Sequence, residues 1–211
     1  METKQIEVKQ LYAGYEDKTV ISGLSFDVLP RDFFCINGPN GSGKTTLVRT
    51  LLGLLPVKDG SVSFFRQGKL VTDTNMGYLP QISLIDRKFP ISVHDVVLFG
   101  LFGNKKRKPT AEDKLKVKEL LSKVGLSQLE NQPIGKLSGG QLQRALFARA
   151  IISSPEILIL DEPDVYMDQS FKSQLIAILQ EMNEQTTVLL VSHHPESFSS
   201  LIKRELYLSK N

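Results

Sequence analysis

The stretch GPNGSGKTT, residues 38–46, matches the phosphate-loop pattern G-x-x-x-x-G-K-[ST] in full. The run DFFCI, residues 32–36, precedes it and is typical of a short buried strand. Leucines then recur at helical spacing, at Leu47, Leu51, Leu54 and Leu55. Because strand, glycine loop and helix form the context that the pattern requires, the sequence predicts a site for a nucleoside triphosphate. A glycine turn that only caps a helix is the alternative, and the flanking pattern disfavours it.

Each residue type in this loop has a chemical reason to be there. Backbone amides of residues 41–45 can surround phosphate oxygens, and the Lys44 ammonium can reach the β- and γ-phosphates. The Thr45 hydroxyl can bind Mg²⁺. The predicted nucleotide-binding residues of the loop are Gly38, Asn40, Gly41, Ser42, Gly43, Lys44, Thr45 and Thr46.

A second element, EILILDEPD at residues 156–164, ends an apolar run with two adjacent carboxylates. Residues 157–160 predict a parallel strand that is buried on both faces. Ligands of such sheets bind at the carboxyl ends of the strands, so Asp161 can hold Mg²⁺ while Glu162 orients or deprotonates the attacking water. A solvated acidic turn is the alternative, and it is weaker once the phosphate loop is accepted.

A third element, IGKLSGGQLQRALFARA at residues 134–150, places Ser138, Gly139 and Gly140 directly before a predicted helix. The helix is indicated by Leu142, Leu146 and Ala150, with Gln141, Gln143, Arg144 and Arg149 on the other face. A helix N-terminus with glycines can bind a phosphate, but the same residues also suit an ordinary capped turn. The residues alone leave both interpretations open.

Together these motifs resemble the ATP-binding cassette of ABC transporters, over essentially the whole chain. LSGGQ, residues 137–141, resembles the family's signature motif. Further matching positions are Gln81 in GYLPQ (glutamine loop), Asp168 in VYMD (aspartate loop), His193 in LLVSHH (switch histidine) and Tyr15 in LYAGYEDKTVISGLSF (adenine-stacking aromatic). The resemblance implies ATP hydrolysis with Mg²⁺. It implies Glu162, His193 and Gln81 as catalytic residues, and Thr45, Gln81 and Asp161 as Mg²⁺ ligands.

The resemblance also implies the fold and its organisation. We expect an α/β fold with a P-loop NTPase core, a mostly parallel sheet, an N-terminal antiparallel β subdomain and an inserted α-helical subdomain. A single domain would cover residues 1–211, with the core at about 1–81 and 151–211 and the helical subdomain at about 82–150. Alternation within residues 5–30 agrees with antiparallel strands. Helical spacing marks Val117, Leu120, Leu121 and Val124, and later Phe171, Leu175, Ile178, Leu179 and Met182.

In this family two cassettes pair head to tail, so the resemblance implies that Ser138, Gly139 and Gly140 bind the γ-phosphate held by a second copy. It further implies a membrane permease subunit and an external substrate-binding protein as partners. The chain departs from the family at Asp164 and at residues 165–167, where small residues are usual. These departures leave the geometry of the aspartate loop, and the coupling of the two ATP sites, open.

Composition narrows the possible partners and the cellular location of the protein. The chain has 211 residues, 26 basic and 23 acidic, and its net charge of +3 gives little reason to expect a nucleic-acid partner. The single Cys35 indicates a core thiol in a reducing compartment. The sequence has no long apolar span and no signal-peptide pattern at its start, so we expect a peripheral protein on the cytoplasmic side of the membrane, held there by the permease.

Other polar residues are expected to be ordinary surface features. His194 should face outward, and His94 should lie on the surface of the helical insert. The histidines have no Cys or His partners at ligand spacing, so a separate protein metal site is not expected. KKRK, residues 105–108, favours a solvated loop, with contact to anionic lipid head groups as the alternative.

The substrate is indicated by resemblance alone. PQISLIDRKFPISVHDVVLFGLFG, from Pro80, resembles the cassettes of importers for zinc, manganese or iron. We expect this segment to form a groove for a helix of the membrane subunit, with Phe89, Ile91 and Val93 as apolar anchors and Asp86, Arg87 and Asp95 on the rim. Importers of iron complexes, exporters, soluble ABC ATPases and a nonhydrolytic regulator are the alternatives. Soluble members usually carry tandem cassettes or long insertions, which do not fit here, and a regulator would need neither Glu162 nor His193.

Overall fold

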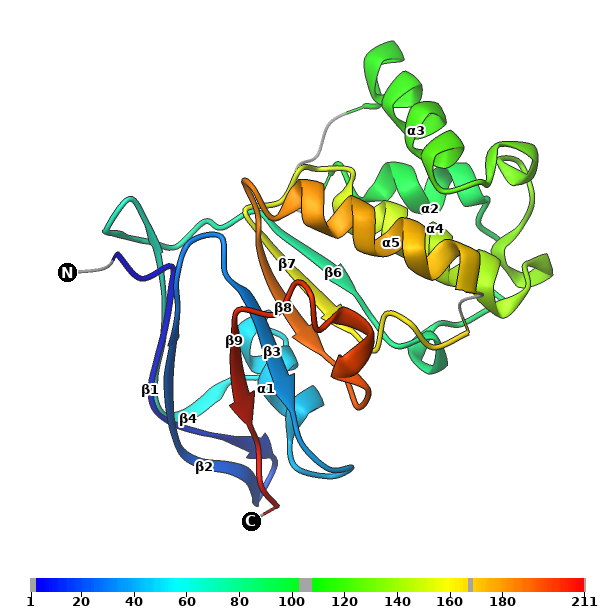
Figure 1. Cartoon of the computed structure of the whole chain (residues 1–211). Coiled ribbons are helices and arrows are strands. Elements are labelled where there is room, and N and C mark those ends of the chain that lie inside the picture. The colour runs from blue at the N-terminus through cyan, green and yellow to red at the C-terminus, as the bar shows by residue number, and fades with distance from the viewer. Residues whose placement is uncertain (1–2, 103–107, 167–168, 211) are drawn as a thin grey trace.

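The computed structural model describes residues 3–102, 108–166 and 169–210 (Figure 1). Its strands are β1 (Ile6–Tyr15), β2 (Lys18–Val28), β3 (Phe33–Asn37), β4 (Val57–Arg66), β5 (Lys69–Val71), β6 (Met76–Leu79), β7 (Ile157–Asp161), β8 (Thr187–Val191) and β9 (Arg204–Tyr207). Its α-helices are α1 (Lys44–Leu51), α2 (Val93–Phe99), α3 (Ala111–Lys123), α4 (Gly139–Ile151) and α5 (Gln169–Met182). Short 3-10 helices lie in the connections at η1 (Ile82–Leu84), η2 (Ser127–Leu129), η3 (Ile134–Lys136) and η4 (Pro195–Phe198).

A parallel sheet in the order β6-β7-β8-β3-β9 forms the centre of the molecule. Its inner strands are buried on both faces, as their continuous apolar runs predict. Along β7, Leu158 and Leu160 join the core that α2 to α5 complete, whereas Ile157 and Ile159 join the core shared with α1 and the antiparallel sheet. The predicted α/β class with a mostly parallel core sheet is confirmed.

The antiparallel sheet has the order β2-β1-β4-β5, and Figure 1 shows it on the side of the parallel sheet away from α2 to α5. The alternating pattern within residues 5–30 corresponds to β1 and β2. However, β4 and β5, which follow the phosphate-loop helix, also belong to this sheet, and β4 pairs with β1 at Ile6↔Phe64. The sequence did not reveal them because the side chains of β4 are exposed or only half-buried, so the strand carries no clear apolar alternation.

Helix α1 ends earlier than the spacing of its leucines predicts. The backbone at Gly53 adopts a φ of +69°, and the Leu54 amide donates to the Arg49 carbonyl at 2.8 Å. A glycine in this left-handed conformation is a common way to end a helix. Leu54 is consequently 68% exposed rather than part of the buried stripe.

The chain between β6 and β7 is mostly helical, as predicted, and comprises η1 and α2 to α4 (Figure 1). Helix α3 begins with a capping box, in which the Thr110 hydroxyl accepts from the Asp113 amide and the Asp113 carboxylate accepts from the Thr110 amide. Its residues Val117 and Leu121 are buried against the core. Within the described ranges, every helix is too short or too polar to cross a bilayer.

Candidate nucleotide-binding and catalytic site

The phosphate loop joins β3 to α1, as the sequence predicts. Glycine is required at Gly38, because a Cβ there would lie 2.3 Å from the Leu208 carbonyl oxygen. Gly43 caps α1 with a φ of +99°, a conformation that other residues rarely adopt. Around these glycines, Asn40 and Gly41 are exposed, Thr45 is half-buried, and Ser42 and Thr46 are buried.

Lys44 is folded inward over this loop. Its side chain is 7% exposed, and Nζ donates to the carbonyl oxygens of Gly38 at 2.7 Å and Pro39 at 3.0 Å. Burial lowers the pKa of Lys44, and the negative charges of Glu162 and Asp161 oppose this shift. The ammonium is therefore held within the phosphate loop, where the charges of the two carboxylates act on it and where backbone amides can bind phosphate oxygens.

Three neighbouring strands bring the catalytic candidates to one edge of the sheet. The phosphate loop follows β3, Asp161 ends β7, and His193 follows β8, and these strands lie in the order β7-β8-β3. Since parallel strands present their carboxyl ends at the same edge, residues from distant parts of the chain meet there.

Asp161 provides an oxygen that is suited to a divalent cation. Its side chain is fully buried, and its Oδ1 lies 3.4 Å from Gln81 Nε2. Its Oδ2 is buried without a hydrogen-bond partner in the described part of the chain. Burial, with a contribution from the charge of Glu162, raises the pKa of Asp161 to about 6. Hard oxygen donors from Asp161, Thr45 and Gln81 fit the preferences of Mg²⁺.

Glu162 and His193 form a close pair in which Glu162 Oε1 and His193 Nε2 are 2.9 Å apart. Glu162 has a φ of +51°, which is uncommon for a residue with a side chain, and its amide donates to the Val191 carbonyl at 2.8 Å. Both side chains are partly exposed, at 22% for Glu162 and 27% for His193. The pair can therefore exchange a proton with a water molecule.

The signature segment begins α4 with a capping box. The Ser138 hydroxyl accepts from the Gln141 amide at 3.2 Å, and the Gln141 side chain accepts from the Ser138 amide at 3.0 Å. The capped-turn interpretation is thus correct, but it does not exclude phosphate binding, because the hydroxyl proton can still be donated. A hollow of about 450 Å³ lies here, lined by Gly125, Ser138, Gly139, Gly140, Gln141, Arg144 and Tyr166.

Two further residues predicted to bind the nucleotide are Tyr15 and Asp168. Tyr15 ends β1 and is 40% exposed, and its hydroxyl accepts from Arg49 Nη1 on α1 at 3.1 Å. Asp168 and Met167 lie outside the described residues, as do residues 105–107 of the basic stretch. The departure at Asp164 has a local explanation, because its carboxylate pairs with Lys172 Nζ at 3.2 Å.

In the segment before α2 that was expected to form a groove, one apolar anchor differs from the prediction. Val93 cannot be an exposed anchor, because the first turn of α2 directs it into the core, where it is fully buried. Phe89 is 59% exposed and Ile91 is half-buried. On the expected rim, Arg87 donates to the Leu137 carbonyl, and Asp95 accepts from the Ser92 hydroxyl at 2.7 Å.

The other two histidines differ in their surroundings. His194 is exposed, as predicted. The prediction of a surface position for His94 holds only in part, since its side chain is 16% exposed. His94 Nδ1 lies 3.2 Å from Asp95 and Nε2 lies 4.0 Å from Glu130.

Sequence reasoning missed Gln143, which it assigned to the polar face of its helix. The side chain is 1% exposed, and Nε2 donates to the carbonyl oxygens of Pro163 at 3.2 Å and Glu162 at 3.4 Å. One signal was present, because the buried Phe147 and Ile151 stand four and eight positions later on the same helical stripe.

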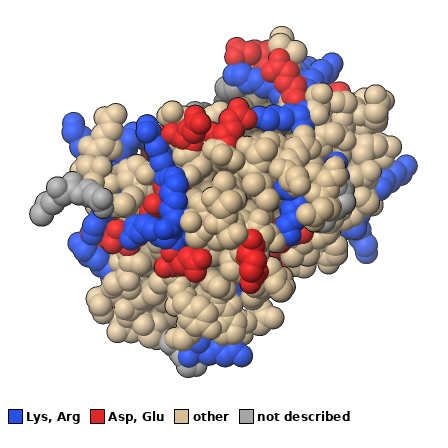
Figure 2. Space-filling view, in the orientation of Figure 1, with Lys and Arg blue, Asp and Glu red and all other residues tan. Residues whose placement is uncertain are grey.

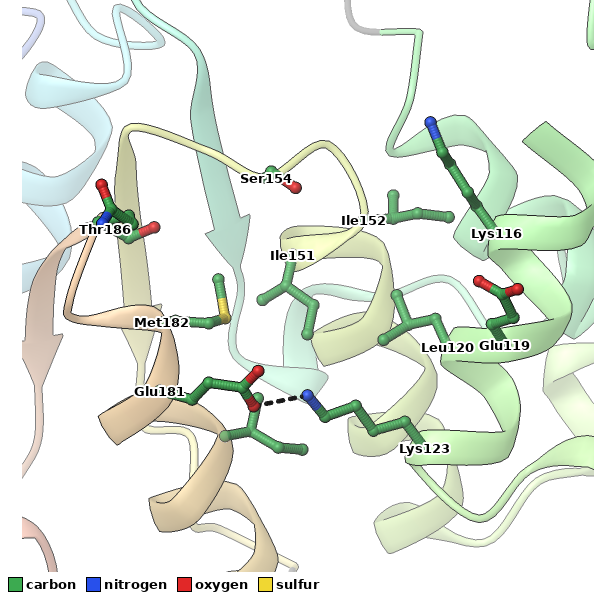
Figure 3. A pocket seen from close by; sticks show the side chains of 12 residues that line it. Lys116, Glu119, Leu120, Lys123, Ile151, Ile152, Ser154, Glu181, Met182 and Thr186 are labelled. Carbon is green, nitrogen blue, oxygen red and sulfur yellow. Dashed lines mark hydrogen bonds and ion pairs between the residues drawn. The ribbon is translucent and has the colours of Figure 1, made fainter. Parts of the chain in front are cut away.

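A second hollow lies apart from these residues. It measures about 540 Å³ and lies between α3, α5 and the end of α4, with Leu120, Ile151 and Met182 among its lining side chains (Figure 3). An ion pair between Lys123 Nζ and Glu181 at 2.8 Å crosses it. None of the predicted site residues that the structure describes lines it. Elsewhere, basic and acidic side chains lie interspersed on the face in view in Figure 2.

A phosphate loop between β3 and α1, with strand-end carboxylates beside it, defines a P-loop nucleotide-binding protein. Residues 21–165 match the family model described as ABC transporter. The chain therefore belongs to the ABC transporter family, as the ATP-binding subunit that hydrolyses ATP.

Named relatives agree with this assignment, and a solved structure shares the fold. The chain is 38% identical to a "Probable metal transport system ATP-binding protein" of Thermotoga maritima, over 90% of this chain and 75% of the relative. It is 35% identical to the manganese transport system ATP-binding protein MntB of Bacillus subtilis, over 90% and 76% respectively. A dimeric ATP-binding cassette bound to ADP and Pi shares the fold, with a TM-score of 0.83 and 22% identity over 98% of this chain and 96% of that one.

Proposed function

We propose that this subunit powers the import of a transition-metal ion, manganese or zinc, through a membrane permease. The observation that carries the ATPase part is the meeting of Lys44, Asp161 and the Glu162–His193 pair at one edge of the parallel sheet. The metal part is supported by the names of the relatives, a manganese system and a metal transport system. The specificity for the ion would reside in the permease and in an external substrate-binding protein, since a cassette recognises its transporter partner rather than the cargo.

In this proposal the phosphate loop binds ATP through the amides of residues 41–45 and the ammonium of Lys44. Thr45, Gln81 and Asp161 would hold Mg²⁺, which neutralises charge on the β- and γ-phosphates when it is bound. Asp161 Oδ2, which is buried with no hydrogen-bond partner among the described residues, supports this assignment. Tyr15 would stack on the adenine.

Glu162 is the proposed general base. It would accept a proton from the attacking water while His193, 2.9 Å from its carboxylate, holds the water and the γ-phosphate in place. The proton leaves the water as its oxygen bonds to phosphorus and the bond to the ADP oxygen breaks. The uncommon backbone conformation of Glu162 supports a functional role, because strained residues cluster at active sites.

A second copy of the chain is required to complete each site. The hollow beside Ser138, Gly139 and Gly140 is not lined by any residue of the phosphate loop. In a head-to-tail dimer this hollow would receive the γ-phosphate held by the other copy, at a helix N-terminus that favours anions. Asp168 would contribute to the same interface.

The permease would dock beside the segment that contains Phe89, an aromatic side chain that is 59% exposed. Large exposed apolar side chains are typical anchors of protein interfaces. Docking there would place the dimer at the cytoplasmic face of the membrane.

The test is the uptake of radiolabelled Mn²⁺ and Zn²⁺ in cells that lack the chain. Wild type should restore uptake under metal limitation, whereas Glu162→Gln should not. Restoration of ferric-chelate uptake instead would favour an iron-complex importer. Unchanged uptake of both metals, with no redundant importer present, would contradict the metal assignment and leave the ATPase function standing.

A further inference from the structure

The turn that carries Glu162 is held from two sides. On one side, its amide donates to the Val191 carbonyl of β8 at 2.8 Å. On the other side, Gln143 Nε2 of α4 donates to the carbonyls of Glu162 at 3.4 Å and Pro163 at 3.2 Å. Because both partners are carbonyl acceptors, only the amide nitrogen of Gln143 can face them. The turn is thus attached to the sheet and to the signature helix at once.

The buried position of Gln143 makes this attachment rigid. Its side chain is 1% exposed, in a part of α4 where Leu142, Leu146 and Phe147 are also buried. Gln143 also lines a small hollow of about 100 Å³ together with Gln81, Glu162 and Tyr166. The side chain therefore sits beside the carboxylate that is proposed to activate water.

A second contact joins the same two segments nearer the start of α4. Tyr166, four residues after Glu162, packs its ring on Gly139, where a Cβ would meet Tyr166 ring atoms at 3.3 to 3.4 Å. A Cβ on Gly140 would lie 2.8 Å from the Tyr166 carbonyl oxygen. The φ of Tyr166 is +69°, a backbone conformation that is uncommon for a residue with a side chain.

We propose that Gln143 is a positioning residue that links the turn of Glu162 to α4. When the second copy holds a nucleotide against the start of α4 in the first copy, this link would adjust the position of the Glu162 carboxylate in the first copy. The inference rests on the proposed roles of Glu162 and of Ser138 to Gly140. A displacement of α4 on nucleotide binding would move the carbonyls of Glu162 and Pro163 with it, because the Gln143 side chain is packed and cannot swing. The two ATP sites would communicate through this link.

The test compares Gln143→Met and Gln143→Leu with wild type in the purified chain. Both variants are similar in volume to glutamine, remove the N–H donors that face the carbonyls and add no buried charge, and two variants guard against the misfolding of either. Losing these hydrogen bonds should lower kcat for ATP by about tenfold, with the KM for ATP and the affinity for a fluorescent ATP analogue little changed. The melting temperature should fall by only a few degrees, because two buried carbonyl oxygens lose their donor while the apolar packing is kept. The matched control is Gln174→Met on α5, which removes a 2.6 Å amide bond to the Lys123 carbonyl, away from the site.

A double variant separates positioning from a general structural role. If Gln143 acts through the Glu162 carboxylate, then Gln143→Met should add no further loss of hydrolysis in a Glu162→Gln background. Independent, multiplied losses would overturn the proposal, as would an equal loss in the Gln174→Met control. Wild-type hydrolysis by Glu162→Gln would contradict the proposed function and this inference with it. Wild-type kcat in both Gln143 variants, with Glu162→Gln inactive, would overturn the inference alone.

Discussion

His193 Nε2 lies 2.9 Å from Glu162 Oε1, although 31 positions separate the two residues in the sequence. The contact exists because β7 and β8 are adjacent and parallel, so the residues that follow them leave the sheet at the same edge. A carboxylate paired with an imidazole can take part in proton transfer with a water molecule. This pair is the chemical centre of the proposed site.

The first prediction concerns Glu162→Gln. The amide keeps the shape of the side chain but cannot accept a proton, so ATP should still bind while hydrolysis falls by roughly 10²- to 10⁴-fold. Phosphate release and gel filtration with ATP measure the two effects, and the ATP-bound dimer should accumulate. Glu156→Gln is the control, since Glu156 pairs with Arg66 at 2.7 Å before β7 begins. Near-normal turnover in Glu162→Gln would remove this residue from the role of general base.

The second prediction tests the shared site by mixing two inactive chains, Ser138→Arg and Lys44→Ala. In a mixed head-to-tail dimer both defects fall in one site, and the other site combines an intact phosphate loop with an intact signature segment. Hydrolysis should therefore recover in part when the chains are mixed. The Lys44→Ala chain assayed alone serves as the control. Failure to complement at any ratio would speak against head-to-tail pairing, unless activity requires both sites.

The third prediction concerns the docking segment. Phe89→Asp should leave ATP binding intact and weaken co-purification with the permease, because an exposed apolar anchor is replaced by a charge. Leu115→Asp on α3 is the matched control, since Leu115 is 56% exposed at a different surface. Equal loss of co-purification in both variants would mean that the effect is not local to the segment of Phe89.

Val93 provides a contrast to Phe89. Because Val93 is fully buried, Val93→Asp should destabilise the fold by about 3 kcal/mol or more, which thermal or denaturant unfolding measures. An unchanged unfolding midpoint would contradict the buried position of this residue.

The fourth prediction concerns the reactivity of Cys35. Burial raises the pKa of this thiol to about 12. At pH 8 only about one thiol in ten thousand would be ionised, and the thiolate is the reactive form. The native protein should therefore resist an aromatic disulfide reagent, whereas the chain unfolded in guanidinium should react with one equivalent. Rapid labelling of the native protein would show that Cys35 is accessible.

The phosphate loop and the strand that ends at Asp161 were predictable because their signals are local. A strand, a glycine loop and a helix follow one another within residues 32–55, and an apolar run of residues 157–160 leads into its carboxylates. Such patterns reflect backbone conformation and chemistry that each segment needs by itself. For the same reason the α/β class and the nucleotide ligand followed from the sequence.

Other features were decided by packing between distant segments. β4 joins the antiparallel sheet by pairing with the edge of β1 that β2 does not occupy. Its own sequence shows no alternation of apolar and polar residues that would predict this pairing. Val93 and Gln143 both face inward, although one was expected at a groove and the other on a polar face. Which side of a helix is buried depends on the elements that surround it.

The sequence by itself therefore determined the family, the phosphate loop and the identities of the candidate catalytic residues. The tertiary structure placed Glu162 Oε1 2.9 Å from His193 Nε2, at the sheet edge where their strands predict them to meet, and it alone decided that Glu162 is attached to α4 through Gln143. The physical reason is that a side-chain hydrogen bond between segments depends on the register of neighbouring strands and the rotation of a packed helix. Both of these are set by long-range contacts, which a local pattern does not encode.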